Sequence, residues 1–430
     1  MKKKDKKKST FLMKLKKVIN KIKYSIFEEV EVDVNSKTTF SIFEVIVLLV
    51  IAILFGIVIG YTITFSRNPV NSLKTNTKLS EIINTYTGIV DNYYDEIDED
   101  ALGDAAIKGM IDSLDDPYSN YMDSITTKDF NETVDGSFVG IGVVLQYDPE
   151  LEYNKIIDIT KNAPAEKAGL KKNDILVKID DEDVKGLFGN SLSKKISSKE
   201  GTKLTVTVQR DGKNKKFNLV TAVVELPSTS YEVFKENDKK IGYIKIDSFA
   251  ANTYDQFKKD LKTLEKKNID SLIIDVRDNP GGHLLQTREI LSLFFNKKTV
   301  LYQISNKDNK EKIYSDTNDV RKYPIVVLIN GGSASASEIL ASCFQDNYKK
   351  ATIIGTKSYG KGTVQKSHTL SNGNSIKYTT QKWLTSKGKW LNEKGVVPDI
   401  VVEQGEDYYK DPVHEKDLIL QEALKKLKES

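Results

Sequence analysis

The sequence predicts a chain of several domains, in which one membrane-spanning helix precedes a helical segment, a small β-rich domain and an α/β domain. Three observations predict this fold class. The length of 430 residues is enough for two or three domains at roughly 100–200 residues each. A single long apolar stretch lies near the N-terminus. After it, the hydrophobic pattern changes from a helical period to short β-rich runs, and then to strands that alternate with helices.

The composition narrows the class of protein further. Charged residues make up 29% of the chain and hydrophobic residues 39%, which fits folded domains and excludes a disordered chain or a multispanning membrane protein. The net charge is +4, and residues 1–41 alone contribute +7, from twelve lysines and five acidic residues. A basic tail on a nearly neutral body is typical of a membrane or localisation signal, so we expect no nucleic-acid partner.

Cysteine and histidine are too scarce for a disulfide framework or a common metal site. The single cysteine, Cys343, excludes an internal disulfide and a multi-cysteine metal site. The three histidines are scattered along the chain and form no metal-binding pattern. We therefore expect no metal and no organic cofactor.

Residues 42–65 are predicted to span a membrane once. They read IFEVIVLLVIAILFGIVIGYTITF, with a single charge at Glu44, and are long enough to cross a hydrocarbon core of roughly 30 Å. A cleaved secretory signal would have an apolar region of about 7–15 residues before a small-residue cleavage site, and residues 61–65 do not fit one. Because the lysine-rich tail precedes the span, we expect a cytoplasmic N-terminus and an extracytoplasmic body at the cell membrane.

Two segments with different hydrophobic patterns follow the predicted span. Apolar residues recur at a helical period between residues 79 and 90, which predicts a helical segment over residues 66–132. Short β-rich runs, such as Val139–Leu145, are then separated by Gly, Asp and Asn turns. They predict a small β-rich domain over residues 133–225.

The rest of the chain predicts an α/β domain over residues 226–405. Strands such as Ile241–Ile246 and Ile325–Ile329 alternate with helical stretches, which is typical of a layered α/β sheet. An amphipathic pattern over Pro412–Lys428 predicts a C-terminal helix within residues 406–430.

The small β-rich domain resembles a PDZ module. Residues 138–143 read Phe-Val-Gly-Ile-Gly-Val, like the carboxylate-binding loop and its following strand, and residues 163–176 resemble the module's short helix and next strand entry. Glycines that serve only tight turns are the simpler alternative, but they do not explain the matching order of loop, strand and helix. Such a loop binds a peptide's terminal carboxylate through backbone N–H groups. The resemblance implies that protein substrates bind by their C-terminal tails at Val139, Gly140, Ile141 and Gly142.

A turn of small residues follows the apolar strand at residues 324–329. Residues 330–339 read Asn-Gly-Gly-Ser-Ala-Ser-Ala-Ser-Glu-Ile and lead into an apolar helix. A hydroxyl at a helix N-terminus lies beside backbone N–H groups that stabilise developing negative charge. Taken alone, three serines in such a turn are more typical of helix caps than of nucleophiles.

Two further strand ends carry polar groups. Residues 355–365 read Gly-Thr-Lys-Ser-Tyr-Gly-Lys-Gly-Thr-Val-Gln and place Lys361 between two glycines. Residues 275–282 read Asp-Val-Arg-Asp-Asn-Pro-Gly-Gly and also follow a buried strand. Open α/β sheets place their sites at the carboxyl ends of the strands. The sequence therefore predicts a hydroxyl, an amine and a pair of glycine amides at one sheet edge.

These motifs together resemble the carboxyl-terminal processing proteases, which are periplasmic or cell-surface serine peptidases with a crotonase/ClpP-like α/β domain. The resemblance runs from Ala-Ile-Lys-Gly-Met at residues 106–110 and Ser-Leu-Asp-Asp-Pro-Tyr-Ser at residues 113–119 to Gly-Val-Val-Pro-Asp at residues 395–399. It implies that Ser335 is the nucleophile, that Lys361 is the general base and that Gln365 orients the lysine. Ser337 stays the alternative nucleophile, although we expect it to be a helix cap.

This chemistry must work without histidine. A lysine is a base only when neutral, so its pKa must fall from ~10.4 toward ~7–8, which burial against apolar walls can achieve. Lys361 would then take the proton of Ser335, whose oxygen attacks the scissile carbonyl to form an acyl-enzyme. The N–H groups of Ala336 and of Gly281 or Gly282 are the candidates for the oxyanion hole.

Other polar residues near these motifs are expected to have no part in the chemistry. Asp278, Asp346 and Glu338 are interpreted as helix caps or surface charges, and Tyr118 as a packing residue after a helix-ending proline.

The predicted function is therefore a membrane-anchored serine endopeptidase that captures the C-terminal tails of its protein substrates. The alternative is a catalytically inactive PDZ adaptor on a protease scaffold, against which the intact Ser335, Lys361 and Gln365 argue. An acyl-CoA enzyme of the related crotonase-like fold would not explain the PDZ module or the membrane span. The helices at residues 76–114 and 412–428 would supply contacts for a homodimer, as in some relatives.

Overall fold

The computed structural model describes residues 49–56, 77–196, 199–318 and 320–430. The chain forms two compact units, residues 1–102 and residues 103–430, and each is described by itself. The predicted basic tail lies outside the described residues, as does the predicted membrane span apart from the helical residues 49–56. Within the described ranges, no helix combines the length and the apolar character needed to cross a bilayer.

The segment predicted to be helical consists mainly of helices. Helix α4 (Thr77–Asn92) lies in the first unit and buries none of its residues, and helix α5 (Glu99–Asp112) continues into the second unit. A short strand, β1 (Asn120–Met122), precedes helix α6 (Ser124–Asp135), which the Asp123 side chain caps by accepting from the Thr126 N–H. The prediction of a helical segment is confirmed, with β1 as its one strand among the described residues.

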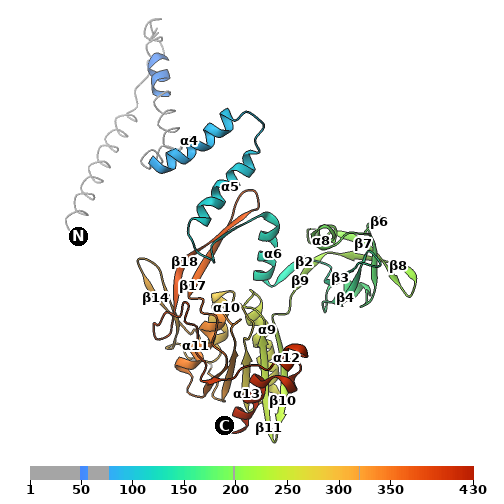
Figure 1. The fold of residues 1–430 in the computed structure, drawn as a ribbon, viewed down its shortest axis with the longest axis vertical. Helices are drawn as coiled ribbons and strands as arrows, with labels where there is room; N and C mark the ends of the chain where they lie inside the picture. Colours follow the sequence, from blue (N-terminus) through green and yellow to red (C-terminus); the bar gives the residue numbers. More distant parts are fainter. Residues whose placement is uncertain (1–48, 57–76, 197–198, 319) are drawn as a thin grey trace, which may run out of the picture. The chain divides into compact units, whose positions relative to one another are not determined.

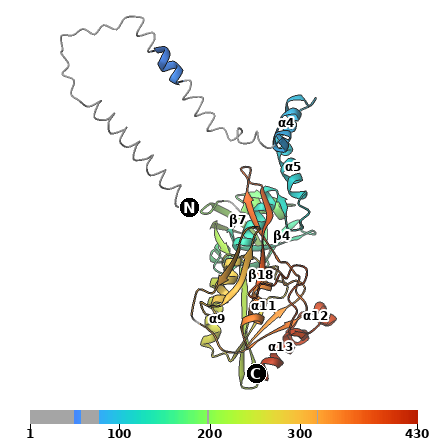
Figure 2. The same ribbon diagram turned by 90° about the vertical axis from the view of Figure 1, so that its left-hand side faces the viewer.

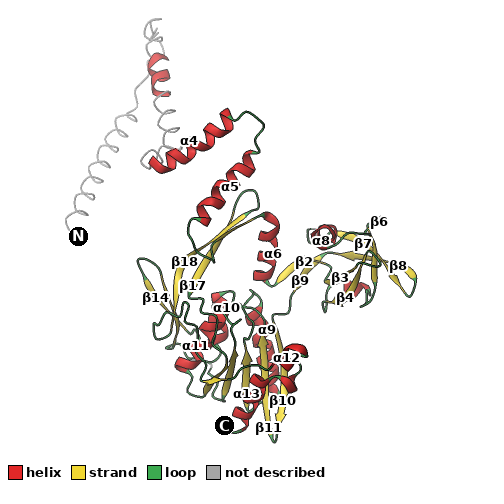
Figure 3. Ribbon diagram, viewed as in Figure 1, coloured by secondary structure: helices red, strands yellow, loops and turns green. Residues whose placement is uncertain are grey.

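The small β-rich domain contains one sheet in the order β3-β4-β5-β7-β8, with β6 added beside β5, and a separate ribbon of β2 and β9. Figure 3 shows that this domain consists mainly of strands. Its elements are β2 (Ser137–Gly140), β3 (Val143–Asp148), β4 (Tyr153–Ile159), α7 (Pro164–Ala168), β5 (Ile175–Ile179), β6 (Glu182–Asp183), α8 (Gly189–Ile196), β7 (Lys203–Arg210), β8 (Lys213–Val220) and β9 (Ala222–Glu225).

The structure divides the β-rich run over Val139–Leu145 into β2 and β3. Gly142 has a φ of 78°, and a Cβ at this position would lie 2.3 Å from the Cβ of Ala163. The backbone therefore turns between the two strands, so β2 pairs with β9 while β3 pairs with β4. This break leaves β3 at the edge of its sheet.

The α/β domain is built on a six-stranded sheet in the order β10-β11-β12-β15-β16-β19 (Figure 1). Strand β10 is antiparallel to β11, and the other neighbours are parallel. Its strands and helices are β10 (Thr229–Glu236), β11 (Lys239–Ile246), α9 (Thr253–Lys266), β12 (Ser271–Asp275), α10 (Leu284–Ser292), β15 (Ile325–Ile329), α11 (Ala336–Asn347), β16 (Ala351–Gly355) and β19 (Ile400–Val401). The prediction of an α/β layer is confirmed.

Helices cover both faces of this sheet. In β12, Leu272 and Ile274 pack into the core formed with α9, α10 and α11, whereas Ile273 packs into a second core formed with α13 (Leu418–Lys428). Figure 2 shows α9 and α13 on either side of the strands. Strands buried on both faces have continuous apolar sequences, as β12 and β15 have here.

The C-terminal helix begins later than predicted. Helix α13 starts at Leu418, because the Asp417 side chain caps it by accepting from the Leu420 N–H. A short helix, α12 (Glu406–Lys410), and a 3₁₀ turn, η1 (His414–Lys416), precede it. Its apolar face is buried on the sheet of its own chain, so this face is not free for a homodimer contact.

A second sheet joins distant parts of the chain. Its order is β1-β18-β13-β14, with β17 also paired to β18. The strands are β13 (Val300–Ser305), β14 (Lys310–Tyr314), β17 (Thr363–Thr369) and β18 (Ser375–Thr385). Through the pairing of β1 with β18, the turn at residues 113–119 is brought next to the hairpin that follows Lys361.

Candidate active site

Ser335 lies in the turn between β15 and α11 and adopts a strained backbone conformation. Its φ is 53° and its ψ is −110°, in the left-handed half of conformational space that residues with a side chain seldom occupy. Such strain costs of order 1–3 kcal/mol and is common at functional sites. The turn presents the partly exposed Ser335 side chain at the N-terminus of α11.

The neighbouring serines are arranged differently from Ser335. Ser333 and Ser337 are fully buried, and their hydroxyls donate to the carbonyl oxygens of Val276 and Asn279, at 2.7 and 2.9 Å. Both hydroxyls therefore hold this turn against the segment that follows β12. Of the three serines, only Ser335 is partly exposed.

Glu338 connects the serine turn to the loop that carries Lys361. Its carboxylate is fully buried. Oε2 accepts the backbone N–H groups of Ser335 and Lys361, at 2.7 and 2.9 Å, and Oε1 accepts the Ser358 hydroxyl and the Gly360 N–H, at 2.6 and 2.7 Å. Four donors compensate for the burial of the charge. The bond from the Ser335 N–H confirms that Glu338 caps the helix, as expected. The burial of Glu338 and its bonds to the loop of Lys361 were not predicted.

Lys361 is half-buried, and its environment favours the neutral amine. Burial is the main factor that lowers the pKa of Lys361, and the charge of Lys377 lowers it further. The carboxylates of Asp116 and Glu338 act in the opposite direction but do not outweigh these effects. The direction agrees with the requirement for a lysine base at neutral pH.

Tyr118 contacts the amine of Lys361, contrary to the interpretation of this tyrosine as a packing residue without a role at the site. The Nζ of Lys361 lies 4.7 Å from the centre of the Tyr118 ring, within the range of a cation–π contact. Burial, a hydrogen bond with Tyr359 and nearby carboxylates raise the pKa of Tyr118 to about 12. The phenol therefore stays neutral at ordinary pH.

Gln365 lies on β17, four residues beyond Lys361. Its Nε2 donates to the hydroxyls of Thr363 and Thr379, at 2.9 and 3.0 Å. Within the described part of the chain, no hydrogen bond joins Gln365 to Lys361. The structure thus brings Gln365 to the edge of the lysine loop and bonds its amide to neighbouring threonines.

Gly281 and Gly282 lie beside the serine turn. A Cβ on Gly281 would lie 2.9 Å from the Cβ of Ser335 and 3.0 Å from the N atom of Ala336, so the backbones are in close contact. The Gly281 N–H donates to Asn279 Oδ1 at 2.8 Å and is engaged in this structure. The first N–H groups of a helix have no partner within it, which keeps Ala336 suited to bind an oxyanion.

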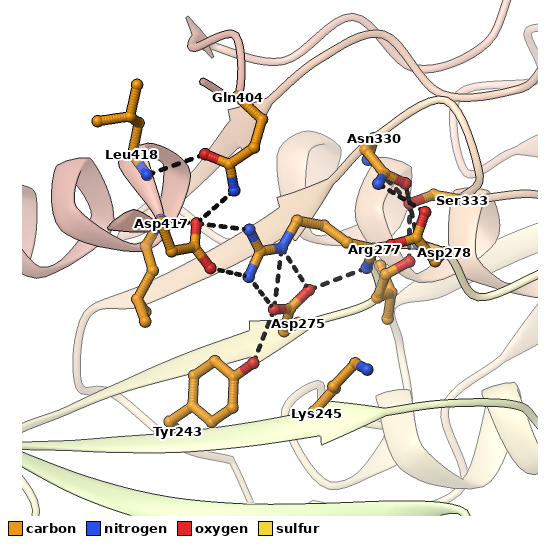
Figure 4. Close-up of polar contacts among 12 residues, drawn as sticks. Tyr243, Lys245, Asp275, Arg277, Asp278, Asn330, Ser333, Gln404, Asp417 and Leu418 are labelled. Atoms are coloured by element: carbon orange, nitrogen blue, oxygen red, sulfur yellow. Dashed lines mark hydrogen bonds and ion pairs between the residues drawn. The ribbon is translucent and has the colours of Figure 1, made fainter. Parts of the chain in front are cut away.

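The segment that leads to these glycines is held by a buried charge network (Figure 4). The guanidinium of Arg277 binds Asp275 at 2.6 Å and Asp417 through two bonds of 2.8 Å. The Tyr243 hydroxyl donates to Asp275 at 2.8 Å, and Gln404 donates to Asp417 at 2.9 Å. The network ties the end of β12 to the start of α13. Sequence reasoning missed it, since its members are distant in the chain.

An open groove of about 820 Å³ lies along the small β-rich domain. Gly140, Ile141 and Gly142 line it, together with Val143 of the edge strand β3 and residues of α8 and α6. Val139 instead pairs with Val223 in the ribbon of β2 and β9. An edge strand beside a glycine loop is suited to add a peptide strand.

Comparisons with known proteins agree with this arrangement. Residues 240–402 match the model of peptidase family S41, residues 137–221 match a PDZ domain, and residues 62–126 match the N-terminal domain of the activating protease CtpB. Carboxy-terminal processing protease CtpB of Bacillus subtilis is 38% identical over 346 residues, which cover 79% of this chain and 71% of that protein. Carboxy-terminal processing protease CtpA of the same organism is 37% identical over 345 residues, which cover 80% of this chain and 72% of that protein.

Among solved structures, the photosystem II D1 C-terminal processing protease is 24% identical. The match covers 76% of this chain and 86% of that one, with a TM-score of 0.44, which is too low to support any conclusion. The assignment therefore depends on the sequence relatives, which match most of this chain and most of their own length. The chain belongs to the carboxy-terminal processing protease family and is a serine-type peptidase with a PDZ domain.

Proposed function

We propose that Ser335 and Lys361 form a catalytic pair with which this peptidase cleaves extracytoplasmic proteins through an acyl-enzyme. The observation that carries the proposal is the shared hydrogen-bond acceptor. One oxygen of Glu338 binds the backbone N–H groups of both residues, which keeps a strained serine and a half-buried lysine in register. The lowered pKa of Lys361 supports its role as the base.

In the proposed reaction, the neutral amine of Lys361 takes the proton of the Ser335 hydroxyl. The oxygen attacks the scissile carbonyl, whose π electrons move to its own oxygen, and the N–H groups of Ala336 and Gly282 stabilise that oxyanion. The ammonium then gives its proton to the leaving amine, and water hydrolyses the ester. Gly281 would join the hole only if its bond to Asn279 opened, because its N–H is engaged.

Gln365 is proposed to orient the base without adding charge. Its amide nitrogen is held by two threonine hydroxyls, so its carbonyl oxygen is available to accept from the amine of Lys361 after a small side-chain movement. A carboxylate in this place would raise the pKa of Lys361, which is the wrong direction for a base.

The PDZ groove is proposed to capture the C-terminal tail of a substrate. The tail would add a strand to the edge of β3, and backbone N–H groups near Gly140, Ile141 and Gly142 would bind its carboxylate. The apolar residues of the groove favour a tail with an apolar end.

Membrane attachment, domain boundaries and assembly are proposals that follow from the sequence. Residues 42–65 would anchor the chain once, with residues 1–41 in the cytoplasm. Residues 66–132, 133–225, 226–405 and 406–430 would be the helical, PDZ, crotonase/ClpP-like protease and C-terminal parts. Helix α4 exposes Ile82, Ile83 and Ile89, which supports a homodimer contact there rather than through α13.

The test uses the full chain in detergent and a flexible protein with an apolar C-terminal tail. We expect cleavage by the unaltered chain, none by Ser335→Ala or Lys361→Ala, and cleavage by the control Ser337→Ala. If Ser335→Ala still cleaved, the nucleophile would be assigned wrongly. If the unaltered chain bound the tail but neither cleaved it nor reacted with a fluorophosphonate, the inactive adaptor would replace the proposal.

A further inference from the structure

The turn at residues 113–119 lies against the base from a distant part of the chain. Tyr118 presents the face of its ring to the Lys361 amine, at 4.7 Å. Tyr359, from the loop of Lys361 itself, is hydrogen-bonded to the Tyr118 side chain. The ring is therefore held from the same loop whose lysine it contacts.

Asp116 fixes this turn to strand β18. Its Oδ1 accepts the Tyr118 N–H at 3.2 Å, and its Oδ2 accepts the hydroxyls of Ser119 and Thr379, at 2.5 and 2.6 Å. The Thr379 hydroxyl also accepts from Gln365 at 3.0 Å. One carboxylate thus sets the position of the tyrosine and, through a threonine, that of the glutamine.

Four charged or titratable groups act on the half-buried Lys361 amine. Asp116 and Tyr118 come from the turn, Glu338 from α11, and Lys377 from β18. The two carboxylates favour the ammonium form of Lys361, and Lys377 favours the neutral amine. The π face of Tyr118 also attracts a cation more than a neutral amine.

We propose that Asp116 and Tyr118 are positioning residues that hold the Lys361 side chain and stabilise the ammonium ion it becomes on accepting the Ser335 proton. This inference rests on the proposed Ser–Lys mechanism. The proton moves from Ser335 Oγ to Lys361 Nζ, the new N–H bond uses the nitrogen lone pair, and the oxygen electrons form the bond to the carbonyl carbon.

The arrangement separates two needs of a lysine base. Burial and Lys377 shift the resting amine toward its neutral form, and Asp116 and Tyr118 favour the charge that develops as the proton arrives. Loss of either turn residue should lower the pH at which Lys361 becomes neutral. It should also make the neutral amine a weaker base, so the maximal rate should fall.

The test reads the two effects separately on the full chain. Competitive acetylation with acetic anhydride, followed by mass spectrometry of the Lys361 peptide, gives the titration midpoint of this amine without any need for activity. The rate of Ser335 reaction with a fluorophosphonate gives the pH profile and its plateau. The variants are Asp116→Asn, Tyr118→Met, Tyr118→Phe and Lys377→Gln.

Asp116→Asn is a mild change, because both groups on Oδ2 are hydroxyls that can turn and accept from the new amide. We expect it and Tyr118→Met to lower the Lys361 midpoint by about 0.5–1.5 pH units and the plateau by roughly three- to thirtyfold. Tyr118→Phe keeps the ring but loses the hydrogen bond with Tyr359, so it should lower the midpoint and the plateau less than Tyr118→Met does. Lys377→Gln should raise the midpoint.

Tyr231→Met is the matched control, because it removes a cation–π partner of Lys267, at 5.3 Å, on strand β10. It should leave both readouts unchanged. Unchanged Lys361 midpoints in both Asp116→Asn and Tyr118→Met would overturn the inference. An unreactive Ser335 in the unaltered chain would overturn the proposed mechanism instead. The acetylation midpoints would still show whether Asp116 and Tyr118 act on Lys361.

Discussion

Ser335 and Lys361 share a hydrogen-bond acceptor. Oε2 of Glu338 accepts the backbone N–H of Ser335 at 2.7 Å and that of Lys361 at 2.9 Å. The serine turn and the lysine loop lie on different strand ends of the sheet, and this carboxylate keeps their backbones at a fixed separation. The proposed nucleophile and the proposed base are therefore coupled through main-chain atoms, independently of any contact between their side chains.

Glu338→Gln should disturb the bridge between the serine turn and the lysine loop. An amide has only one oxygen, so its NH₂ group must face one pair of donors, either those of Ser335 and Lys361 or those of Ser358 and Gly360. A buried donor without a partner costs about 1–3 kcal/mol. We expect at least a roughly tenfold slower fluorophosphonate reaction at Ser335, at ~1.4 kcal/mol per factor of ten.

The matched control for this change is Glu265→Gln, which alters a carboxylate that binds Arg321 and Tyr323 away from the site. Its reaction rate should equal that of the unaltered chain. Equal rates for Glu338→Gln and the unaltered chain would show that the shared acceptor does not matter for the reaction.

Gly281→Ala should impair the site more than the fold. Gly281 has a φ of 103°, and the added Cβ would lie 2.9 Å from the Cβ of Ser335 and from the carbonyl oxygen of Ala334. Relief of this overlap must move the serine turn away from the proposed oxyanion hole. We expect a roughly hundredfold slower reaction of Ser335, as for the loss of an oxyanion donor.

Gly373→Ala is the control for Gly281→Ala, because it adds backbone strain without displacing the serine turn. Gly373 has a φ of 86°, but its nearest neighbour would lie 3.5 Å from the new Cβ. It should lower the melting temperature and leave the reaction rate unchanged. A similar rate loss in both variants would mean that general strain, not the position of Ser335, explains the effect.

Lys361→Met should stabilise the fold at neutral pH. The environment lowers the pKa of Lys361, chiefly by burial, so the folded state disfavours its charge. The resulting penalty is fully present below the lowered folded pKa and disappears above the unfolded value of ~10.4. The variant should therefore unfold at higher urea concentration than the unaltered chain near pH 7, and this gain should shrink as the pH rises. A gain that grew with pH would contradict the assigned direction.

Asp417→Asn should destabilise the fold, with a defined pH dependence. Burial alone would raise the pKa of Asp417, but the bonds and charge of Arg277 outweigh it and hold that pKa below its usual range. The stabilisation is therefore present above the unfolded pKa of ~3.9 and is lost as the pH falls through the lower folded value.

The asparagine variant can keep the helix cap through its one oxygen, but it removes the charge and one acceptor of the Arg277 guanidinium, so we expect a loss of roughly 1–3 kcal/mol at neutral pH. Urea unfolding at about pH 7 and about pH 3 measures the difference between the two chains. It should be large at neutral pH and small in acid. A difference independent of pH would rule out the charge as its cause.

The sequence was sufficient to predict the layers of the fold and the motifs of the site. Apolar runs such as Ile325–Ile329 are long enough to specify a buried strand, and the small-residue turn after it predicts an exposed serine. The Ser-x-x-Glu spacing of Ser335 and Glu338 is also a capping-box pattern, so half of the role of Glu338 could have been read from the sequence.

Long-range contacts could not be predicted in this way. Nothing local marks Tyr118 as a neighbour of Lys361, because the contact depends on the pairing of β1 with β18. The buried bridge from Arg277 to Asp417 similarly depends on where α13 packs. The division of the run at Val139–Leu145 depends on the tight approach of Gly142 to Ala163.

The most direct test of the Ser–Lys pair is to locate a fluorophosphonate adduct on the full chain by mass spectrometry at about pH 8, with an apolar-tailed peptide present. We predict one adduct on Ser335, retained in Ser337→Ala and absent in Lys361→Met. An adduct on Ser337, or full labelling of Ser335 in Lys361→Met, would contradict the proposed catalytic pair.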